Sequence, residues 1–345
     1  GGMSSRILLF SALLVAAGCE TSGGGTVCDG MPDCERTEAE LIAAHGFTPQ
    51  PHTVRTYDGF LLSMHRILPL SPNTKAGEGG AVLLQHGLLD SGHTWLLNGR
   101  NGSLAFVLAD AGYDVWLGNN RGNVYSTAHE SLVPSQEAFW AWSWDEMARY
   151  DLPAMISHIQ SASGSKRVSV IGHSQGTLQT FASLSLPPSM LPPGSPPLSE
   201  MLGSLIALAP VAFVNSIQSP IIRSLAELPG GEATLLFGSK SFLPSTDSLR
   251  RLLPTVCIET PWVCKSVSCM VAGCDRVSPH INATRWPVYL SHYPSGTSVR
   301  TMLHWAQSVR EGTFSMFDRG SREANIRAYG TPTPPPPNPP RAPGG

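Results

Sequence analysis

The chain has 345 residues, which is enough for one large α/β domain that carries an insertion. Apolar residues make up 41% of it, an ordinary share for a globular protein, and the formal net charge of -2 favours neither nucleic acid nor an anionic surface as a partner. The sequence has no run of eighteen apolar residues, so we expect no transmembrane segment.

The first eighteen residues have the pattern of a secretory signal. Arg6 precedes an apolar stretch over residues 7–17, and small residues close it. We expect a signal peptide here, with a buried N-terminal helix as the alternative. The small residues before Cys19 also resemble a bacterial lipoprotein cleavage box, which leaves a lipid anchor on Cys19 open. Residues 19–37 are rich in Gly, Thr, Ser and Asp and indicate a flexible leader.

Between residues 38 and 210, candidate helices and strands alternate. Helices are expected over residues 38–44, 104–111 and 144–159, and strands over residues 53–57, 61–68, 81–85, 113–117, 168–171 and 203–209. Asp58-Gly59 between the first two strands is a strong hairpin signal, and Pro153 is expected to kink the third helix. Such an alternation predicts an α/β fold with a mostly parallel central sheet that is covered on both faces.

Residues 172–176 read Gly-His-Ser-Gln-Gly and form a G-x-S-x-G motif between a β-branched strand and an apolar helix. The two glycines remove Cβ atoms where neighbouring backbone comes close, so the serine hydroxyl stands clear at a helix N-terminus. There the helix dipole and free backbone N–H groups favour the negative charge that develops in acyl transfer. The motif predicts Ser174 as a nucleophile, and an ordinary Gly-flanked serine in a turn is the alternative.

Beyond residue 210 the alternation ends. Residues 211–327 carry short helical segments, a cluster of cysteines and several apolar aromatic side chains. Residues 328–345 are dominated by proline, which cannot donate ladder hydrogen bonds, and they predict a solvated, disordered polyproline tail.

The seven cysteines fall into two groups, one near the N-terminus and one in the region after residue 210. They are Cys19, Cys28 and Cys34, then Cys257, Cys264, Cys269 and Cys274. In a secreted chain we expect disulfides in the second group; a zinc site is the competing interpretation, although no C-x2-C pair occurs. Because seven is odd, at least one cysteine is unpaired within the chain or is the lipidated Cys19.

Several longer blocks occur in a fixed order along the chain. They include Leu84-Gln-His-Gly-Leu-Leu-Asp-Ser, Asn120-Arg-Gly-Asn, Trp144-Asp-Glu-Met-Ala-Arg-Tyr-Asp-Leu-Pro-Ala, Gly172-His-Ser-Gln-Gly-Thr and Gly296-Thr-Ser-Val-Arg-Thr-Met-Leu-His-Trp. From about residue 46 to about residue 329, these blocks resemble the acid lipases of the gastric and lysosomal type within the α/β-hydrolase fold. The resemblance implies a hydrolase core over residues 38–210 and a helical cap or lid over residues 211–327.

The resemblance also implies roles for individual residues. Ser174 corresponds to the family's nucleophile, and the backbone N–H groups of Leu88 and Gln175 correspond to its oxyanion hole. Asn101-Gly-Ser and Asn282-Ala-Thr are glycosylation sequons at places where the family carries them. The family's cap disulfide corresponds to Cys257–Cys264, with a spacing that departs by a couple of residues. Neither a cofactor nor a metal is implied.

The family places its triad acid and histidine after the last two core strands, beyond the cap. In this sequence the proline-rich segment begins where the first of those strands is expected. We therefore expect the chain as printed to be truncated, to lack the last core strands with the triad acid and histidine, and to turn over little substrate. The histidines after Ser174 are His280, His292 and His304, and none is expected to replace the missing base. His86 and His173 are expected to pack and hydrogen-bond rather than to act as bases.

Two classes of function follow from these observations. The first is a secreted or lysosomal (vacuolar) lipase that hydrolyses neutral lipid esters, triacylglycerol or steryl ester, at a lipid–water interface, with a general carboxylesterase as its neighbour. The second is a non-catalytic lipid-binding chain or a gene fragment. The motifs of the core favour the enzyme, and the expected truncation favours the second class.

Overall fold

The computed structural model describes residues 28, 30–69, 79–217, 219–228, 230–246, 248, 250 and 281–336. The expectations for the signal peptide, for Cys19 and for the Cys257–Cys264 disulfide fall outside these residues, as do His280 and residues 337–345 of the proline-rich segment. In the part of the chain that is described, no helix is long and apolar enough to cross a membrane.

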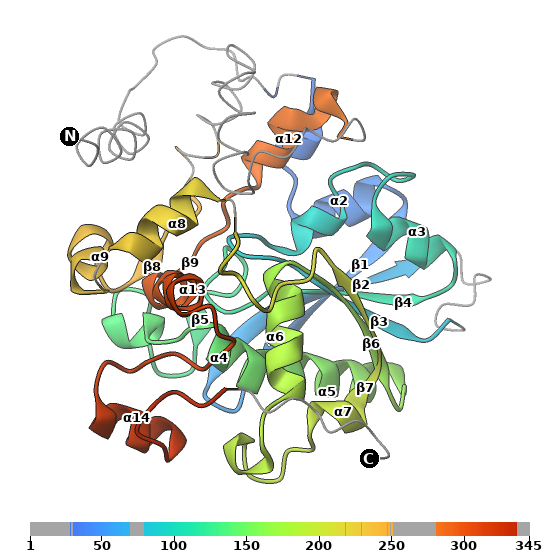
Figure 1. The fold of residues 1–345 in the computed structure, drawn as a ribbon. Helices are drawn as coiled ribbons and strands as arrows, with labels where there is room; N and C mark the ends of the chain where they lie inside the picture. Colours follow the sequence, from blue (N-terminus) through green and yellow to red (C-terminus); the bar gives the residue numbers. More distant parts are fainter. Residues whose placement is uncertain are drawn as a thin grey trace.

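A seven-stranded sheet forms the centre of the molecule (Figure 1). Its strands are β1 (Phe47–Arg55), β2 (Phe60–Pro69), β3 (Ala81–Gln85), β4 (Asp114–Gly118), β5 (Ala128–His129), β6 (Val168–His173) and β7 (Leu202–Leu208). Their order is β1-β2-β4-β3-β6-β7, and β5 pairs with β2. The strands from β4 to β7 in this order run parallel, whereas β1 and β2 are antiparallel to their neighbours. The predicted α/β fold with a mostly parallel sheet is confirmed.

The predicted hairpin around Asp58-Gly59 joins β1 and β2. Gly59 has a φ of +94°, a conformation that glycine adopts without strain, and the Thr56 hydroxyl accepts a hydrogen bond from the amide of Phe60 at 2.9 Å. Both strands extend beyond the predicted ranges because their paired residues continue from Phe47 opposite Pro69 to Arg55 opposite Leu61.

Helices cover both faces of the sheet, so two separate apolar clusters form. On one face, α2 (Glu38–Ala44) and α3 (Leu104–Asp110) bury Ile42 and Phe106 against Leu84 and Leu117. On the other face lie α5 (Leu152–Ser163), α6 (Gln175–Leu184) and α7 (Leu198–Met201), whose cluster contains Leu83, Trp116 and Val170 (Figure 1). Burial on both faces explains why these central strands read as continuous apolar runs.

The helix predicted over residues 144–159 consists of three parts. It begins as α4 (Trp144–Glu146), continues as the π-turn η5 (Met147–Asp151) and becomes α5, with Pro153 in its first turn. The irregularity of the helix therefore lies close to Pro153, as expected, but it is a π-turn that precedes the proline and not a kink at it. In the first turn of an α-helix the missing N–H of proline has no cost, which is why α5 begins there.

The strand predicted at 203–209 is present as β7, but the expectation that it is buried is only half right. Its side chains alternate between covered and open, and Ile206 and Leu208 are 49% and 38% exposed. Within the described residues β7 pairs with β6 alone.

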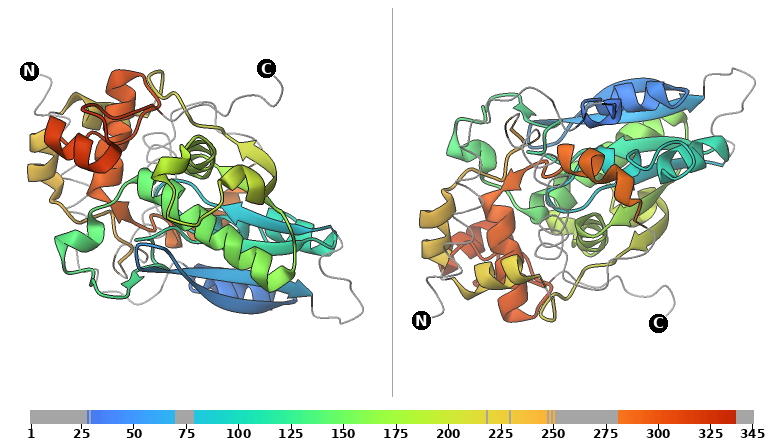
Figure 2. Two further views of the ribbon diagram at one scale, coloured as in Figure 1. Left: turned by 90° about the horizontal axis from the view of Figure 1, so that it is seen from below. Right: turned by 90° about the horizontal axis from the view of Figure 1, so that it is seen from above.

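The region after residue 210 packs at one end of the sheet (Figure 2). It comprises α8 (Pro220–Glu227), α9 (Gly230–Phe237), β8 (Ser241–Phe242), α12 (Trp286–Ser291), β9 (Thr297–Ser298), α13 (Val299–Glu311) and α14 (Arg322–Tyr329). α13 lies between α8 and the core, because Met302 and Ala306 pack in one cluster with Leu225 of α8 while Trp305 belongs to the core cluster.

Two expected boundaries differ from the structure. Residues 30–37, expected in a flexible leader, are held by the Cys28–Cys34 disulfide and by ion pairs of Asp33 with Arg36 and Arg285. This disulfide lies in the first cysteine group, and the second group, for which the sequence predicts disulfides, lies outside the described residues. At the other end α14 continues to Tyr329, whose hydroxyl donates to the carbonyl oxygen of Phe317 at 2.8 Å, so residues 328 and 329 are part of a packed helix rather than of a tail.

Candidate active site

Ser174 lies in the sharp turn between β6 and α6. Its backbone has a φ of 50° and a ψ of −117°, a conformation that side-chain-bearing residues rarely adopt. The amide of Ser174 donates to the carbonyl oxygen of Leu208 at 3.0 Å, so the end of β7 holds this turn. Ser174 is half-buried, and its hydroxyl therefore remains within reach of a ligand.

The glycines of the motif have the role that the sequence predicts. A Cβ atom on Gly176 would clash with the carbonyl oxygen of Gln85, and one on Gly172 would lie 2.9 Å from the carbonyl oxygen of Gly176. Both neighbours are backbone atoms, which cannot rotate away. The close approach brings the start of α6 against the end of β3, the strand that leads to Leu88.

The segment after β3 lies directly against Ser174. A Cβ atom on Gly87 would be 3.2 Å from the Cβ atom of Ser174, so the residue before Leu88 touches the turn. Leu89 has a φ of 58°, and its carbonyl oxygen accepts a hydrogen bond from the amide of Ser295 at 2.7 Å. The structure thus places the residue before Leu88 against Ser174, and the oxyanion hole assigned to Leu88 and Gln175 stays a prediction.

The side chain of Gln175 is fixed from two sides. Its Oε1 accepts a hydrogen bond from the indole Nε1 of Trp305 in α13 at 2.8 Å. Its Nε2 lies 3.6 Å from the Sδ of Met147, which begins the π-turn η5. All three residues are buried. Sequence reasoning singled out Gln175 but missed both partners, since neither is near it in the chain.

His86 is a structural residue. Its Nδ1–H donates to the carbonyl oxygen of Gly87 at 2.8 Å, and its Nε2 accepts from the amide of Asn120 at 3.1 Å. Both ring nitrogens are therefore occupied, and complete burial lowers the pKa of His86 to about 4. The expectation that His86 and His173 pack and hydrogen-bond is confirmed for His86, whereas the buried Nδ1 of His173 has no hydrogen-bond partner among the described residues.

The two other described histidines beyond α6 are also engaged away from Ser174. His292 places its Nε2 2.8 Å from the carbonyl oxygen of Asp33. His304 stacks on Trp144 with 3.8 Å between ring centres, and its ring nitrogens contact Ser143 and Ser315. Burial lowers the pKa of His304 to about 3. Throughout the described ranges, no hydrogen bond joins the hydroxyl of Ser174 to a histidine, and His280 lies outside them.

An amide network behind the turn joins β3, β4 and α6. The Nε2 of Gln85 donates to the Oδ1 of Asn120, and the Nδ2 of Asn120 donates to the Oε1 of Gln179, both at 3.0 Å. These side chains are fully or almost fully buried. Asn120 belongs to the Asn-Arg-Gly-Asn block, which was the available signal, but the sequence did not show what it contacts.

Arg121 of the same block is buried in an ion-pair triad. Its Nε lies 2.8 Å from the Oδ1 of Asp151, and its two terminal nitrogens bind the carboxylate of Asp58 at 2.6 and 2.9 Å. The two carboxylates come from the β1–β2 turn and from the end of the π-turn. Arg121 therefore ties the hairpin to the helix that precedes β6.

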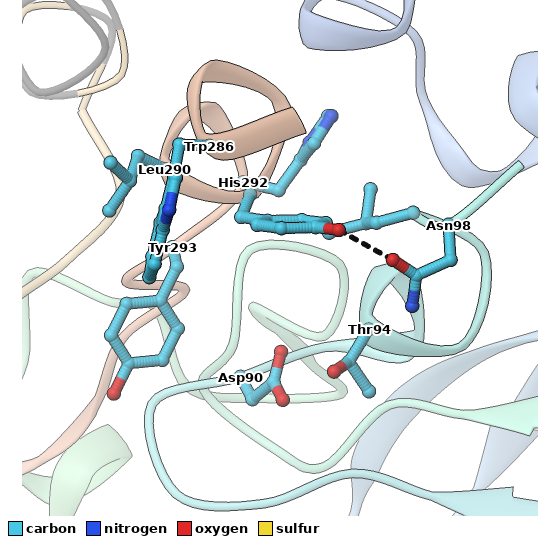
Figure 3. A pocket seen from close by; sticks show the side chains of 9 residues that line it. Asp90, Thr94, Asn98, Trp286, Leu290, His292 and Tyr293 are labelled. Atoms are coloured by element: carbon cyan, nitrogen blue, oxygen red, sulfur yellow. Dashed lines mark hydrogen bonds between the residues drawn. The ribbon is translucent and has the colours of Figure 1, made fainter. Parts of the chain in front are cut away.

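A cavity of about 270 Å³ lies between the segment after β3 and α12 (Figure 3). Asp90 and Thr94 line one side, and Trp286 and Tyr293 line the other. Burial raises the pKa of Asp90 to about 7. Hydrogen bonds from the Ser91 amide and from Thr94 lower this pKa, but their effect is smaller than that of burial. Asp90 follows Leu88 by two residues, so the cavity borders the candidate site.

Asn101 and Asn282, the two sequon asparagines, are exposed, which is the arrangement that glycosylation requires. The described residues contain no group of three or more acidic, histidine or cysteine side chains suited to hold a metal ion.

Comparison with known proteins gives similarity across the chain. A family model described as a partial alpha/beta-hydrolase lipase region matches residues 39–99, and one for the alpha/beta hydrolase fold matches residues 80–191. The chain is 39% identical to gastric triacylglycerol lipase of Rattus norvegicus over 331 residues, covering 94% of this chain and 81% of that protein. It is 38% identical to lysosomal acid lipase/cholesteryl ester hydrolase of Homo sapiens over 337 residues, covering 96% and 82%. An esterase structure from Pyrococcus furiosus matches with 18% identity and a TM-score of 0.35, covering 63% of this chain and 64% of that one.

Proposed function

The chain belongs to the family of gastric and lysosomal acid lipases and is thus a carboxylic ester hydrolase with a lipase function, and from this we propose that Ser174 is its nucleophile on neutral lipid esters. The substrates are triacylglycerols or steryl esters, the two classes that the names of its relatives contain. The backbone N–H groups of Leu88 and Gln175 form the oxyanion hole.

The reaction is an acyl transfer in two steps. The Oγ of Ser174 bonds to the ester carbonyl carbon, the bond to the alcohol oxygen breaks, and the alcohol leaves with the proton. Water then adds to the acyl-enzyme, releases the fatty acid and returns the proton to Ser174. In each tetrahedral intermediate, negative charge develops on the former carbonyl oxygen, and the two N–H groups stabilise it.

The single observation that carries the proposal is the backbone of Ser174. A strained φ at a half-buried serine persists only where neighbours fix it, here through the Leu208 carbonyl and the glycine contacts of the motif. We attribute the strain to the need to point the Ser174 hydroxyl towards the substrate, because a serine with a purely structural role would adopt an ordinary, unstrained turn.

An apolar surface around the cap supports a lipid substrate. Leu235 and Leu236 of α9 are 87% and 58% exposed, and Phe213 is 67% exposed. Exposed apolar groups of this size favour contact with a lipid surface. A general carboxylesterase is the competing proposal, and it has no need of this surface.

We also propose that the protein is secreted or lysosomal. The names of its relatives indicate these locations for those proteins, and the exposed sequons Asn101 and Asn282 are accessible for modification in the secretory pathway.

Because the triad acid and histidine are expected beyond the printed sequence, the test uses the chain extended with the C-terminal segment of a relative. It compares this protein with its Ser174→Ala variant on emulsified triolein, emulsified cholesteryl oleate and soluble p-nitrophenyl butyrate. Hydrolysis of an emulsified ester that disappears in Ser174→Ala, by on the order of 10⁶-fold in turnover, supports the proposal. Activity confined to the soluble ester would favour the carboxylesterase. Turnover that survives Ser174→Ala would refute the nucleophile.

A further inference from the structure

Trp305 lies on the face of α13 that is turned to the core. It is 3% exposed, and its indole N–H donates to the Oε1 of Gln175 at 2.8 Å. An indole has one donor and no acceptor, so this bond uses the whole hydrogen-bonding capacity of the side chain. The two residues are 130 positions apart, and the bond joins α13 to the first residue of α6.

α13 is itself anchored to the core at its N-terminus and at the residue before Trp305. The hydroxyl of Ser298 caps the helix by accepting from the amide of Thr301 and donates to the carbonyl oxygen of Trp142 at 2.6 Å. His304 stacks on Trp144 at 3.8 Å. These contacts fix the position of α13 relative to the core, and with it the position of the Trp305 indole that binds Gln175.

Leu88 belongs to the same surroundings. It packs against the cluster that contains Val299 and Met302 of α13 together with Leu225 of α8, and also against the core cluster that contains Trp305. Residues of α13 are thus members of both clusters against which Leu88 packs, and Trp305 of the same helix binds Gln175.

We propose that Trp305 is a positioning residue for the oxyanion hole. Its indole N–H holds the side chain of Gln175, and through it the first residue of α6, in the orientation in which the Gln175 N–H meets the developing oxyanion. The inference rests on the proposed function, since it requires Ser174 to be the nucleophile. Trp305 touches neither substrate nor the reacting atoms.

The test is Trp305→Phe, which removes the donor and keeps an aromatic ring in the core. Because the bond positions an N–H group that is needed for the charge of the transition state, kcat for p-nitrophenyl butyrate should fall about tenfold while KM changes less than twofold. The matched control is Trp140→Phe. Trp140 is also buried, and its indole N–H donates to the carbonyl oxygen of Pro134 at 2.8 Å. The Trp140→Phe variant therefore also loses one indole hydrogen bond, but its kcat should stay within twofold of wild type.

A second variant keeps the inference falsifiable if Trp305→Phe folds poorly. Gln175→Ala retains Trp305 and the backbone N–H of residue 175, and it should lose the same factor of about ten in kcat. The double variant should lose no more than either single one, because both remove the same bond. Equal kcat in Gln175→Ala and wild type, or independent losses that multiply, would overturn the inference.

Binding of octylboronic acid, followed by calorimetry, supplies a readout without turnover. A boronic acid forms a tetrahedral adduct with a nucleophilic serine, so its affinity should fall about tenfold in Trp305→Phe and vanish in Ser174→Ala. Undiminished affinity in Trp305→Phe would refute the positioning role alone. Undiminished affinity and turnover in Ser174→Ala would instead refute the proposed function.

Discussion

The amide of Ser174 and the carbonyl of Leu208 are joined by a hydrogen bond of 3.0 Å, which links the turn after β6 to the last residue of β7. The strained turn is therefore held from outside, by a neighbouring strand, and not by its own sequence alone. This has a measurable consequence, because strain that is imposed by neighbours lowers the free energy of unfolding.

The first prediction concerns the stability of the turn. Ser174→Gly should raise the free energy of unfolding by about 1 kcal/mol, since glycine adopts a φ of 50° without strain. Ser174→Ala keeps the strained backbone and should differ little from wild type. Both variants should lose ester hydrolysis. Urea denaturation measures the difference, and a Ser174→Gly protein less stable than Ser174→Ala would contradict the strain.

The second prediction concerns the close approach of α6 to β3. Gly176→Ala should cost about 3 kcal/mol of unfolding free energy, because the new Cβ atom meets the carbonyl oxygen of Gln85, which cannot move aside. Gly203→Ala is the control. Its new Cβ atom would lie 3.2 Å from the hydroxyl of Ser169, a side-chain end that can rotate, so the cost should stay below about 1 kcal/mol. Equal losses in thermal melts of the two variants would show that close backbone contact is not the cause.

The third prediction concerns the buried charge of Arg121. Arg121→Met leaves the carboxylates of Asp58 and Asp151 without their partner and should cost about 3–5 kcal/mol. Arg55→Met provides the comparison, because the Arg55–Glu130 pair is exposed and solvent screens it, so its loss should change the free energy of unfolding little. Chemical denaturation of both variants checks this, and a loss below about 1 kcal/mol for Arg121→Met would argue against the triad.

The fourth prediction concerns pH. Burial raises the pKa of Asp90 to about 7, so the folded protein keeps a proton that the unfolded chain releases near pH 4. Asp90 therefore favours folding below about pH 4 and loses that contribution as the pH rises to about 7. Asp90→Asn should raise Tm at pH 8 relative to wild type and change it little at pH 4.

Calorimetric scans at the two pH values measure this shift in Tm. Asp110→Asn serves as control, since Asp110 is exposed and pairs only at the surface with Arg100. Its effect on Tm should be small at both pH values. A gain in Tm for Asp90→Asn that is the same at pH 4 and pH 8 would show that Asp90 is charged in the folded protein.

The sequence predicted the elements whose signals are local. The apolar run at Ala81–Gln85, the Asp58-Gly59 hairpin and the G-x-S-x-G turn each require only neighbouring residues to be recognised. The capping box of Thr37 with Glu40 is a local signal of the same kind, at the start of α2. The candidate nucleophile Ser174 is in this local class as well, because its motif is short, whereas the roles of Leu88 and Gln175 are what the resemblance to the acid lipases implies.

What the sequence did not predict depends on distant partners. The bond from Trp305 to Gln175 joins residues 130 positions apart, and no spacing rule connects them. The ion pair of Asp33 with Arg285, which helps to hold the segment expected to be a flexible leader, spans 252 positions. The partial exposure of the β7 side chains could not be predicted for the same reason. An apolar run indicates a strand, but it does not indicate which elements cover each face of that strand.

The π-turn Met147–Asp151 constrains the number of residues between α4 and α5 more strongly than it constrains which residue types stand there. Each of its hydrogen bonds encloses one residue more than a bond of an α-helix does. Deleting one residue there would restore a continuous α-helix and rotate everything before the turn by about 100° about the helix axis. Met147 would then leave Gln175, and Trp144 would leave His304. Deleting one residue in this turn should therefore disturb the structure more than most substitutions in it. Among related proteins we expect the residue types of the turn to vary more readily than the number of its residues.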